Sequence, residues 1–441
     1  MRQHTEDQAA DSTEDRTAAP TLDPTGDPAA DPAGAAWRYR WAILGIATFT
    51  QAASGFFVQG IGALGLHLQR DLDLSTAQLG LLISAAQLVP LAGLLVAGEL
   101  LDRHDERWVV GFGACAVAVA LGLGSVVPGY VPLLCVLLVV GAGYSTVQPG
   151  GSKSVASWFD TSQRGLAMGI RQAGLPLGAA LGSAVLPFLA GAYGWRSTLV
   201  AGGLAALLGA AVFMGFHRRP PSRTAPRRPA PRAPLASELR ARIRMFREPS
   251  MTKIMLSGAS LISVQGGVGI LTVLHLHETA SLGAGTAALV LVAAQAAGAV
   301  GRVGLAAWSD RAGSGRFATV TFCMVAVIAG TVVLMTPLGR SPAVACSVLV
   351  WLGFFGFGWY GPWVAHVAEA APPGRTGFAL GLAMSVNQIA IVLVPPTLGL
   401  LKDLTGSFTP AWALLSAMTA VALAATTRGG RGHRSHPPGT G

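Results

Sequence analysis

The chain has 441 residues, of which 51% are hydrophobic and only 12% are charged, well below the roughly 25% usual in soluble domains. Its formal net charge is +10, but the basic residues alternate with long apolar runs instead of forming one compact basic patch. The composition therefore excludes an ordinary soluble domain, and the charge gives no reason to expect nucleic acid as a partner.

Charged residues between Trp41 and Thr427 gather at intervals of about 25 residues, and the runs between them are apolar. A helix of about 20 residues crosses the hydrocarbon core of a bilayer, so each run predicts one membrane-spanning helix. The twelve predicted spans are residues 41–66, 78–101, 107–127, 132–153, 165–190, 196–217, 253–276, 286–308, 317–337, 343–366, 377–400 and 410–427.

Three segments give no reason to fold. Residues 1–36 carry eight acidic residues and many Ala, Pro and Thr, which predicts a disordered acidic tail and not a cleavable signal peptide. Residues 218–250 form a basic, Pro-rich linker whose stretch 237–246 is typical of a short amphipathic helix on the inner leaflet. The remaining predicted parts are an N-terminal six-helix bundle (37–217), a C-terminal six-helix bundle (251–427) and a disordered tail (428–441).

The first half of the chain recurs about 210 residues later, and an offset held over so many residues indicates duplication of a whole half. An apolar chain built from two similar halves is typical of secondary transporters. The anchors are His67, Gln87, Asp102 and Arg103, which recur at an offset of 208 as His275, Gln295, Asp310 and Arg311, and Pro149, Gly165 and Gly169, which recur at 212 or 213 as Pro362, Gly377 and Gly381.

The strongest motif follows the second span and reads GELLDRHDER from Gly98; its counterpart after the eighth span reads AAWSDRAGSGR from Ala306. Together they resemble the paired signature of the major facilitator superfamily, although Asp105 and Ala306 stand where that family usually has Gly. The resemblance covers about residues 38–427. It implies an all-α membrane protein with twelve transmembrane helices in two pseudo-symmetric six-helix bundles. It also implies a cytoplasmic gate formed by Gly98, Asp102, Arg103, Arg107, Asp310, Arg311 and Arg316.

The fifth span begins RGLAMGIRQ at Arg164 and resembles the fifth helix of bacterial organic-anion and cyanate or nitrate-type permeases of the same superfamily. Its glycines, four residues apart, are sufficiently explained by close helix packing. The resemblance implies a multi-pass protein of the bacterial inner membrane, the plasma membrane. Because Lys and Arg are retained in the cytoplasm, and one set of alternate loops is nearly free of them, both termini and the linker are expected inside.

Two arginines lie inside predicted spans, Arg171 and Arg302, each about 9–12 Å from the cytoplasmic boundary. A charge at mid-bilayer costs at least about 2.5–3.5 kcal/mol, so it is usually paired or faces water. The acidic residues all fall in the tail, in loops or near helix ends. A carboxylate-like substrate would supply the missing partner, bidentately if geometry allows. The alternatives are hydrogen bonds from Arg171 to backbone carbonyls, and an Arg302 side chain that extends toward Asp310.

Further polar side chains fall where the family lines its central cavity. As a set they imply a wall for a small substrate with an apolar or aromatic part, although each alone is more often a helix–helix contact. Histidines are candidates for proton coupling because imidazole titrates near neutral pH. The additional substrate-binding candidates are Gln51, Gln148, Gln265, Tyr360 and Trp363, and the proton-coupling candidates are His366 and His275.

Sequence motifs of other classes are absent. There is no GxxxxGK[ST] phosphate loop, no zinc-protease histidine pair and no GxSxG turn, so the chain is not expected to be an enzyme. The four cysteines fall in predicted spans without the spacing of a metal pair. We therefore expect no catalytic residue, no metal and no cofactor.

The preferred hypothesis is a secondary active transporter that moves a small organic anion by alternating access, with proton coupling left open. Its expected partners are that anion and the lipid bilayer, and its expected state is a monomer. The alternative is a multidrug or hydrophobic-compound efflux antiporter, which predicts an acidic residue in the cavity. A non-transporting sensor is disfavoured because no additional signalling domain is predicted.

Overall fold

The structure is a computed structural model that describes residues 32–428 apart from positions 75, 221–243, 246 and 313–314. Residues up to Tyr39 form one unit, and Arg40–Gly441 form a second compact unit. All regular elements among the described residues are helices, which confirms the predicted all-α class. The predicted tails, the linker and its amphipathic stretch lie largely outside the described residues.

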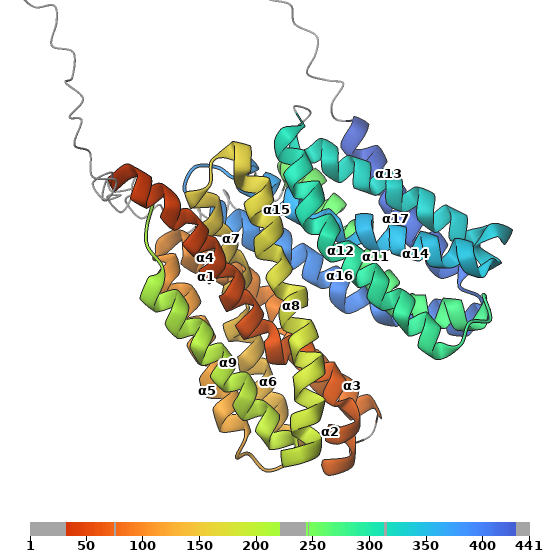
Figure 1. The fold of residues 1–441 in the computed structure, drawn as a ribbon, viewed down its shortest axis with the longest axis horizontal. Helices are drawn as coiled ribbons and strands as arrows, with labels where there is room; N and C mark the ends of the chain where they lie inside the picture. Colours follow the sequence, from red (N-terminus) through yellow and green to blue (C-terminus); the bar gives the residue numbers. More distant parts are fainter. Residues whose placement is uncertain (1–31, 75, 221–243, 246, 313–314, 429–441) are drawn as a thin grey trace, which may run out of the picture. The chain divides into compact units, whose positions relative to one another are not determined.

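Two groups of helices follow one another along the chain. The N-terminal bundle consists of α1 (Pro32–Gly60), η1 (Ile61–Leu64), α2 (Gly65–Asp71), α3 (Thr76–Leu88), α4 (Pro90–Arg103), α5 (Glu106–Gly124), α6 (Tyr130–Tyr144), α7 (Val147–Trp158), α8 (Thr161–Tyr193) and α9 (Trp195–Phe216). The C-terminal bundle consists of α11 (Pro249–Glu278), α12 (Ala284–Arg311), α13 (Arg316–Met335), η3 (Pro337–Arg340), α14 (Pro342–Gly358), α15 (Tyr360–Ala370), α16 (Thr376–Thr405) and α17 (Thr409–Arg428). Figure 1 shows the two bundles, which meet mainly through the pairs α8–α12 and α4–α16.

Eleven helices or helix pairs among the described residues are long and apolar enough to cross a membrane, and each overlaps a predicted span. The one predicted span that these eleven do not cover, residues 78–101, falls on α3 and α4, which have 13 and 14 residues. This span is interrupted because Pro90 has no N–H to continue the helical hydrogen bonds. Several boundaries differ from expectation by a few residues or more; among them, α1 begins at Pro32 and α11 at Pro249, since proline is favoured in the first turn of a helix.

Two further interruptions lie at equivalent places of the two repeats. The helix is interrupted at Thr146, between α6 and α7, and again 213 residues later at Trp359, between α14 and α15. Each break is followed three residues on by a proline, Pro149 or Pro362. A proline removes one backbone donor and leaves the carbonyl four residues earlier without its helical partner. The duplication has therefore kept each kink together with the proline that causes it.

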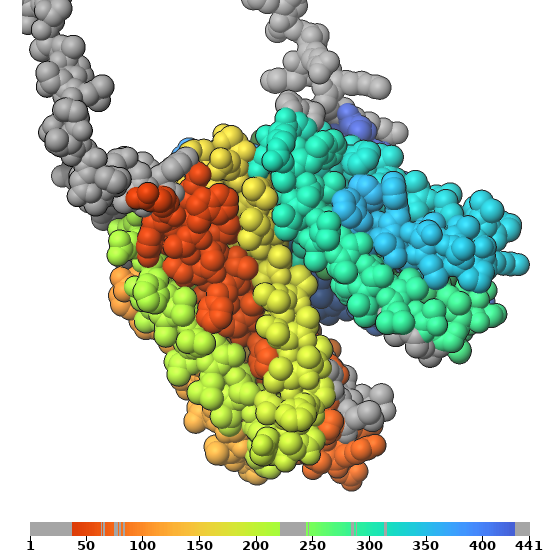
Figure 2. All heavy atoms as spheres, viewed as in Figure 1, coloured from red at the N-terminus to blue at the C-terminus, as the bar shows by residue number. Residues whose placement is uncertain are grey.

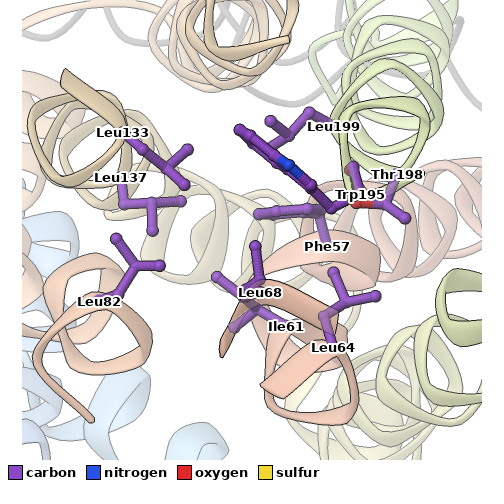
Figure 3. Close-up of a pocket in the computed structure, with 10 residues that line it drawn as sticks. All are labelled: Phe57, Ile61, Leu64, Leu68, Leu82, Leu133, Leu137, Trp195, Thr198 and Leu199. Atoms are coloured by element: carbon purple, nitrogen blue, oxygen red, sulfur yellow. Dashed lines mark hydrogen bonds between the residues drawn. The ribbon is translucent and has the colours of Figure 1, made fainter. Parts of the chain in front are cut away.

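The interior of the N-terminal bundle is a continuous apolar core with a small cavity of about 10 Å³. Figure 3 shows the side chains that point into this cavity, including Phe57, Leu82 and Leu137. The hydroxyl of Thr198, also in the lining, donates to the carbonyl of Trp195 at 2.5 Å. A space of this size without a free polar group stays dry, so it is a packing defect and not a ligand site.

Glycines let the two inter-bundle helix pairs approach backbone to backbone. A Cβ atom on Gly98 of α4 would lie 2.6 Å from the carbonyl oxygen of Gly377, and one on Gly381 of α16 would overlap the carbonyl of Leu94. In the other pair, a Cβ on Gly169 of α8 would meet the backbone of α12 in the same way. These glycines therefore set how closely the bundles meet.

Gly381→Ala is expected to destabilise the protein by about 1–3 kcal/mol, because the new methyl group would overlap the α4 backbone. Gly399→Ala on the same helix is the matched control, since a Cβ there has no heavy atom within 4 Å. The control is expected to gain up to about 1 kcal/mol from helix propensity. Thermal unfolding in detergent micelles measures both, and equal shifts for the two variants would contradict the tight packing at Gly381.

Candidate functional site

Two equivalent aspartates join the bundles at the end of the molecule where the linker leaves them, here named the linker end. Asp102, in the last turn of α4, accepts hydrogen bonds from the backbone N–H groups of Gly377 and the next residue at 2.8 and 2.7 Å. Asp310, in the last turn of α12, accepts from those of Gly165 and the next residue at 2.9 and 2.7 Å. A carboxylate near a helix N-terminus is stabilised by these bonds and by the helix dipole. Each bundle thus supplies one aspartate that binds near the start of a helix in the other bundle.

Lys153 of α7 partly neutralises the first aspartate. Its Nζ lies 3.7 Å from Asp102 and 3.1 Å from Glu106, and it also donates to the carbonyl of Leu101. All four residues belong to the N-terminal bundle. Lys153 therefore supports the Asp102 contact.

The second aspartate belongs to a larger charge network. Arg316 pairs with Asp310 and also with Glu369, at 2.7 Å. Glu369 is in addition 3.3 Å from Arg164 of α8, in the other bundle. This ion pair is a further direct link between the bundles, and neither Glu369 nor Arg164 was among the predicted gate residues.

The other predicted gate arginines contact their own helices. Arg103 pairs with Glu99 of its own helix at 2.5 Å, and the guanidinium of Arg107 lies 5.4 Å from the ring centroid of Trp108. Arg311 is exposed and donates to a carbonyl of its own helix at 3.4 Å. The predicted gate residues that the structure brings to the inter-bundle interface are Gly98, Asp102, Asp310 and Arg316.

The contact between α8 and α12 ends partway along the two helices. Gly169 of α8 faces the backbone of Arg302, and Arg302 also donates to the carbonyl of Gln172 at 2.9 Å. On α12, Gly298, about one turn further from the linker end, faces α14 of its own bundle. Beyond this level the helices diverge, and Figure 2 shows the surface hollowed between the bundles on that side. The conformation is closed at the linker end and open opposite to it.

Arg171 of α8 is completely buried close to this level. Its Nη2 donates to Gln51 Oε1 at 3.0 Å and to the carbonyls of Val147 and Gln148 at 3.0 and 2.7 Å. Gln51 in turn donates to the hydroxyl of Tyr144 at 3.0 Å. Hydrogen bonds to backbone carbonyls, the predicted alternative to anion binding, are therefore made by Nη2. Nε and Nη1 have no hydrogen-bond partner among the described residues.

Arg302 of α12 reaches across to the N-terminal bundle. Its Nη1 donates to the carbonyl of Gln172 at 2.9 Å and its Nε to that of Phe357 at 3.3 Å. The guanidinium lies 5.9 Å from the ring centroid of Tyr360, whose hydroxyl accepts from Gln148 Nε2 at 2.6 Å. Residues from both bundles thus form one polar layer around the two arginines.

Neither Arg171 nor Arg302 forms an ion pair within the described part of the chain. Asp310, toward which Arg302 could have extended, is engaged by Arg316 instead. The two buried cations are therefore compensated by carbonyl, amide and aromatic groups alone. Such groups lower the cost of burial without cancelling the charge, so the layer is suited to an anion.

The remaining predicted site residues border this layer or lie apart from it. Trp363 packs beside Tyr360, with ring centroids 5.6 Å apart. Gln265 is half-buried on α11, and His366 is half-buried against α13. His275 is buried at the opposite end of the C-terminal bundle, where it accepts a hydrogen bond from Trp412 at 3.3 Å.

Several polar residues of the interface were not among the predicted site residues. Gln388 of α16 donates to the carbonyl of Gln87 at 3.0 Å, and Gln87 donates to Gln59 Oε1 at 3.3 Å. Gln172 directly follows Arg171 in the sequence, and both atoms of its buried amide lack a partner among the described residues. Adjacency to Arg171 is the one signal that could have drawn attention to Gln172.

A larger pocket of about 410 Å³ lies on the C-terminal bundle between α11, α16 and α17. Its lining is aliphatic apart from Ser263 and Thr397, whose hydroxyls donate to carbonyls of their own helices. Two of the lining side chains, Ile389 and Leu393, are largely exposed. This pocket suits a hydrocarbon group and not an anion.

The family model of the Major Facilitator Superfamily matches residues 44–395, so the chain belongs to this superfamily of membrane transporters. A crystal structure of the transporter FucP in the outward conformation aligns with a TM-score of 0.73 at 16% identity, covering 89% of this chain and 99% of that one. The proton:xylose symporter XylE aligns with a TM-score of 0.70 at 16% identity, covering 89% and 96%. These likenesses confirm the predicted fold class.

Sequence relatives are transporters of the same superfamily. An uncharacterized MFS-type transporter of Mycobacterium tuberculosis is 29% identical over 386 residues, 85% of this chain and 82% of the relative. A hexuronate transporter of Bacillus subtilis is 26% identical over 166 residues, 38% of this chain and 39% of the relative. A 4-hydroxybenzoate transporter of Pseudomonas putida is 29% identical over 178 residues, 40% of each chain. The protein is therefore a multi-pass membrane transporter.

Asp102→Asn is expected to weaken the closed linker end by about 1–2 kcal/mol, because an amide has one acceptor oxygen for the two N–H groups of α16. Spin labels on the exposed residues Tyr193 of the N-terminal bundle and Leu338 of the C-terminal bundle report the change. Both residues lie at the open end, away from the linker. Their separation is expected to shift to shorter values as the linker end opens. Asp403→Asn, an exposed acid on the same helix as Gly377, is the control. Identical distance distributions for Asp102→Asn and wild type would contradict the assigned role.

His217, just beyond the end of α9, predicts a pH dependence of stability. Its Nε2 lies 2.8 Å from the hydroxyl of Ser154, and burial lowers its pKa against the opposing effect of Glu106 and Asp105. An unfolded histidine titrates near 6.5, so below about that pH the unfolded chain binds a proton that the folded chain does not, and stability falls as the pH falls. The melting temperature of His217→Gln is therefore expected to drop less than that of wild type between pH 7.5 and 5.5. The exposed His104→Gln should behave as wild type.

Proposed function

We propose that the protein is a secondary active transporter that moves a small organic anion, a carboxylate, across the bacterial inner membrane by alternating access. The observation that carries this proposal is the completely buried guanidinium of Arg171. Among the described residues it has no carboxylate partner, and two of its nitrogen atoms have no hydrogen-bond acceptor. A substrate carboxylate at this point would supply the missing charge and an acceptor for one of these nitrogen atoms. Arg302 would contribute a second cation from the other bundle.

The position of Arg171 supports the same proposal. It lies two residues after Gly169, where α8 packs against α12, so its level along α8 is that of the boundary between the closed linker end and the open side. Rocking of one bundle against the other would expose the same site to the other side of the membrane. The excess of basic residues near the linker supports a cytoplasmic linker end, and the described state would then face outward.

The named relatives point in the same direction over part of the chain. Hexuronate and 4-hydroxybenzoate are both carboxylates, and each of these relatives matches about two fifths of this chain. Proton coupling enters the proposal through the histidines, with His366 beside the Glu369 network at the linker end and His275 at the opposite end. The proposed partners are the anion and the bilayer, and the proposed state is a monomer.

A multidrug efflux antiporter, the alternative, requires an acidic residue facing the cavity. The acids that form ion pairs among the described residues lie toward the linker end, as Asp102 and Glu369 do, or at the opposite end, as Glu278 does. We therefore favour an anionic cargo over a hydrophobic or cationic one.

Uptake of radiolabelled glucuronate, galactonate and 4-hydroxybenzoate into proteoliposomes tests the proposal. For the carboxylate that wild type transports, Arg171→Gln is expected to lower kcat/KM by about a hundredfold, because the bound anion loses its buried counter-charge. Arg171→Lys keeps the charge and is expected to retain part of the activity. Arg340→Gln, an exposed arginine at the open end, is the matched control and should transport as wild type does. Undiminished uptake by Arg171→Gln, with unchanged apparent affinity, would sink the assignment of an anion site.

A further inference from the structure

Gln172 carries an amide that the proposed anion site does not yet use. The residue is completely buried, and neither Oε1 nor Nε2 has a hydrogen-bond partner within the described residues. Buried amides are nearly always paired, because burial without a partner forfeits the hydrogen bonds they make to water. Two unpaired atoms on one buried side chain therefore indicate a binding function.

Two observations place this residue on the face of α8 between the bundles. Arg302 of the other bundle donates to the Gln172 carbonyl at 2.9 Å, so the opposing helix is within reach. Gly165 and Gly169, where a Cβ would meet α12, lie about 20° and 60° from Gln172 around the helix at 100° per residue. Gln172 also follows Gly169, the glycine at which α8 still touches α12, by less than one turn. It therefore lies beside Arg171 at the floor of the opening between the bundles.

The chemistry of an amide differs from that of a guanidinium in one decisive respect. Arg171 offers donors alone, whereas Gln172 offers a donor at Nε2 and an acceptor at Oε1. A carboxylate can satisfy Nε2 but leaves Oε1 unpaired, since it has no hydrogen to donate. A hydroxyl group, or two neighbouring hydroxyls, both donates and accepts, and so satisfies both amide atoms.

We propose that Gln172 determines substrate specificity by recognising a hydroxyl group next to the carboxylate held by Arg171. The cargo is then a hydroxycarboxylate and not an unsubstituted acid. This inference rests on the proposed anion transport and adds the second functional group of the substrate.

Matched ligand pairs test the inference on the full-length protein in micelles. Gluconate and hexanoate, and lactate and propionate, differ within each pair by hydroxyl groups that include one next to the carboxylate, and ligand-induced thermal shifts give their affinities. Wild type is expected to bind the hydroxylated member of at least one pair about tenfold more tightly. Gln172→Met, of similar size but without the amide, is expected to lose this preference while its affinity for the unsubstituted acid stays within about twofold.

The outcomes separate the two proposals. The role of Gln172 is overturned if Gln172→Met still binds the hydroxylated acid more tightly than the unsubstituted one. It is also overturned if wild type binds both members of each pair equally well. Anion transport stands in either case. Binding of no carboxylate at all by wild type overturns both.

Ligand-free stability separates a binding role from a structural one. Gln172→Met removes an unpaired amide, so its melting temperature is expected to equal or exceed that of wild type. The matched control is Gln388→Met, which breaks the paired contact with Gln87 and is expected to lower the melting temperature by a few degrees. A loss in Gln172→Met as large as in the control, or a failure to fold, would show that Gln172 is structural and overturn the inference.

Discussion

The carboxylates of Asp102 and Asp310 each accept two backbone hydrogen bonds near the start of a helix in the opposite bundle, and the arrangement of the molecule depends on these contacts. The interaction of a charge with a helix terminus falls off within about one turn. The contact therefore cannot stretch: it is present when the helix ends meet and absent once they separate. Glycines such as Gly98 and Gly169 add close packing to the same contact, because they let the backbones of the two helices touch. A connection with two discrete states is what a rocking mechanism requires.

Duplication accounts for this scaffold but not for the polar layer inside it. At the offset of 212, Arg171 of the first repeat answers to Ala383 of the second, and at 208 Arg302 answers to Leu94. Gln51 answers to an alanine in the same way. The two aspartates that join the bundles and the glycines they meet, Gly165 and Gly377, have thus kept their identity in both repeats, whereas the residues around the buried charge occur once. A single small anion has no two-fold symmetry, so a site that holds it in one orientation must depart from the symmetry of the bundles that move around it.

The parts that sequence could predict follow from local patterns. Span positions come from runs of apolar residues, and the equivalence of Asp102 and Asp310 comes from the repeat offset, so the helices agree with the structure and the two aspartates lie at equivalent places in it. Contacts across the bundles depend instead on which faces of apolar helices meet, and apolar periodicity does not encode this when the whole surface is apolar. The link between Gln388 and Gln87 and the orientation of Gln172 could not be predicted for that reason. Arg103 and Arg311 were assigned to the gate by motif alone, and their side chains turn to their own helices.

The hydrogen bonds of Arg171 also limit how it can hold an anion. A guanidinium offers parallel donors along two edges, and both edges include Nη2. Nη2 already donates to Gln51 and to two carbonyls beside the break before α7, so a carboxylate meets Nε and Nη1 one at a time unless those bonds are released. Single donors bind less strongly than a bidentate pair, which leaves the second carboxylate oxygen for a donor on another helix. If that donor is Arg302, the anion is held fully only while the two bundles stand at the right separation. Binding and closure then depend on each other through the distance between two arginines on opposite bundles.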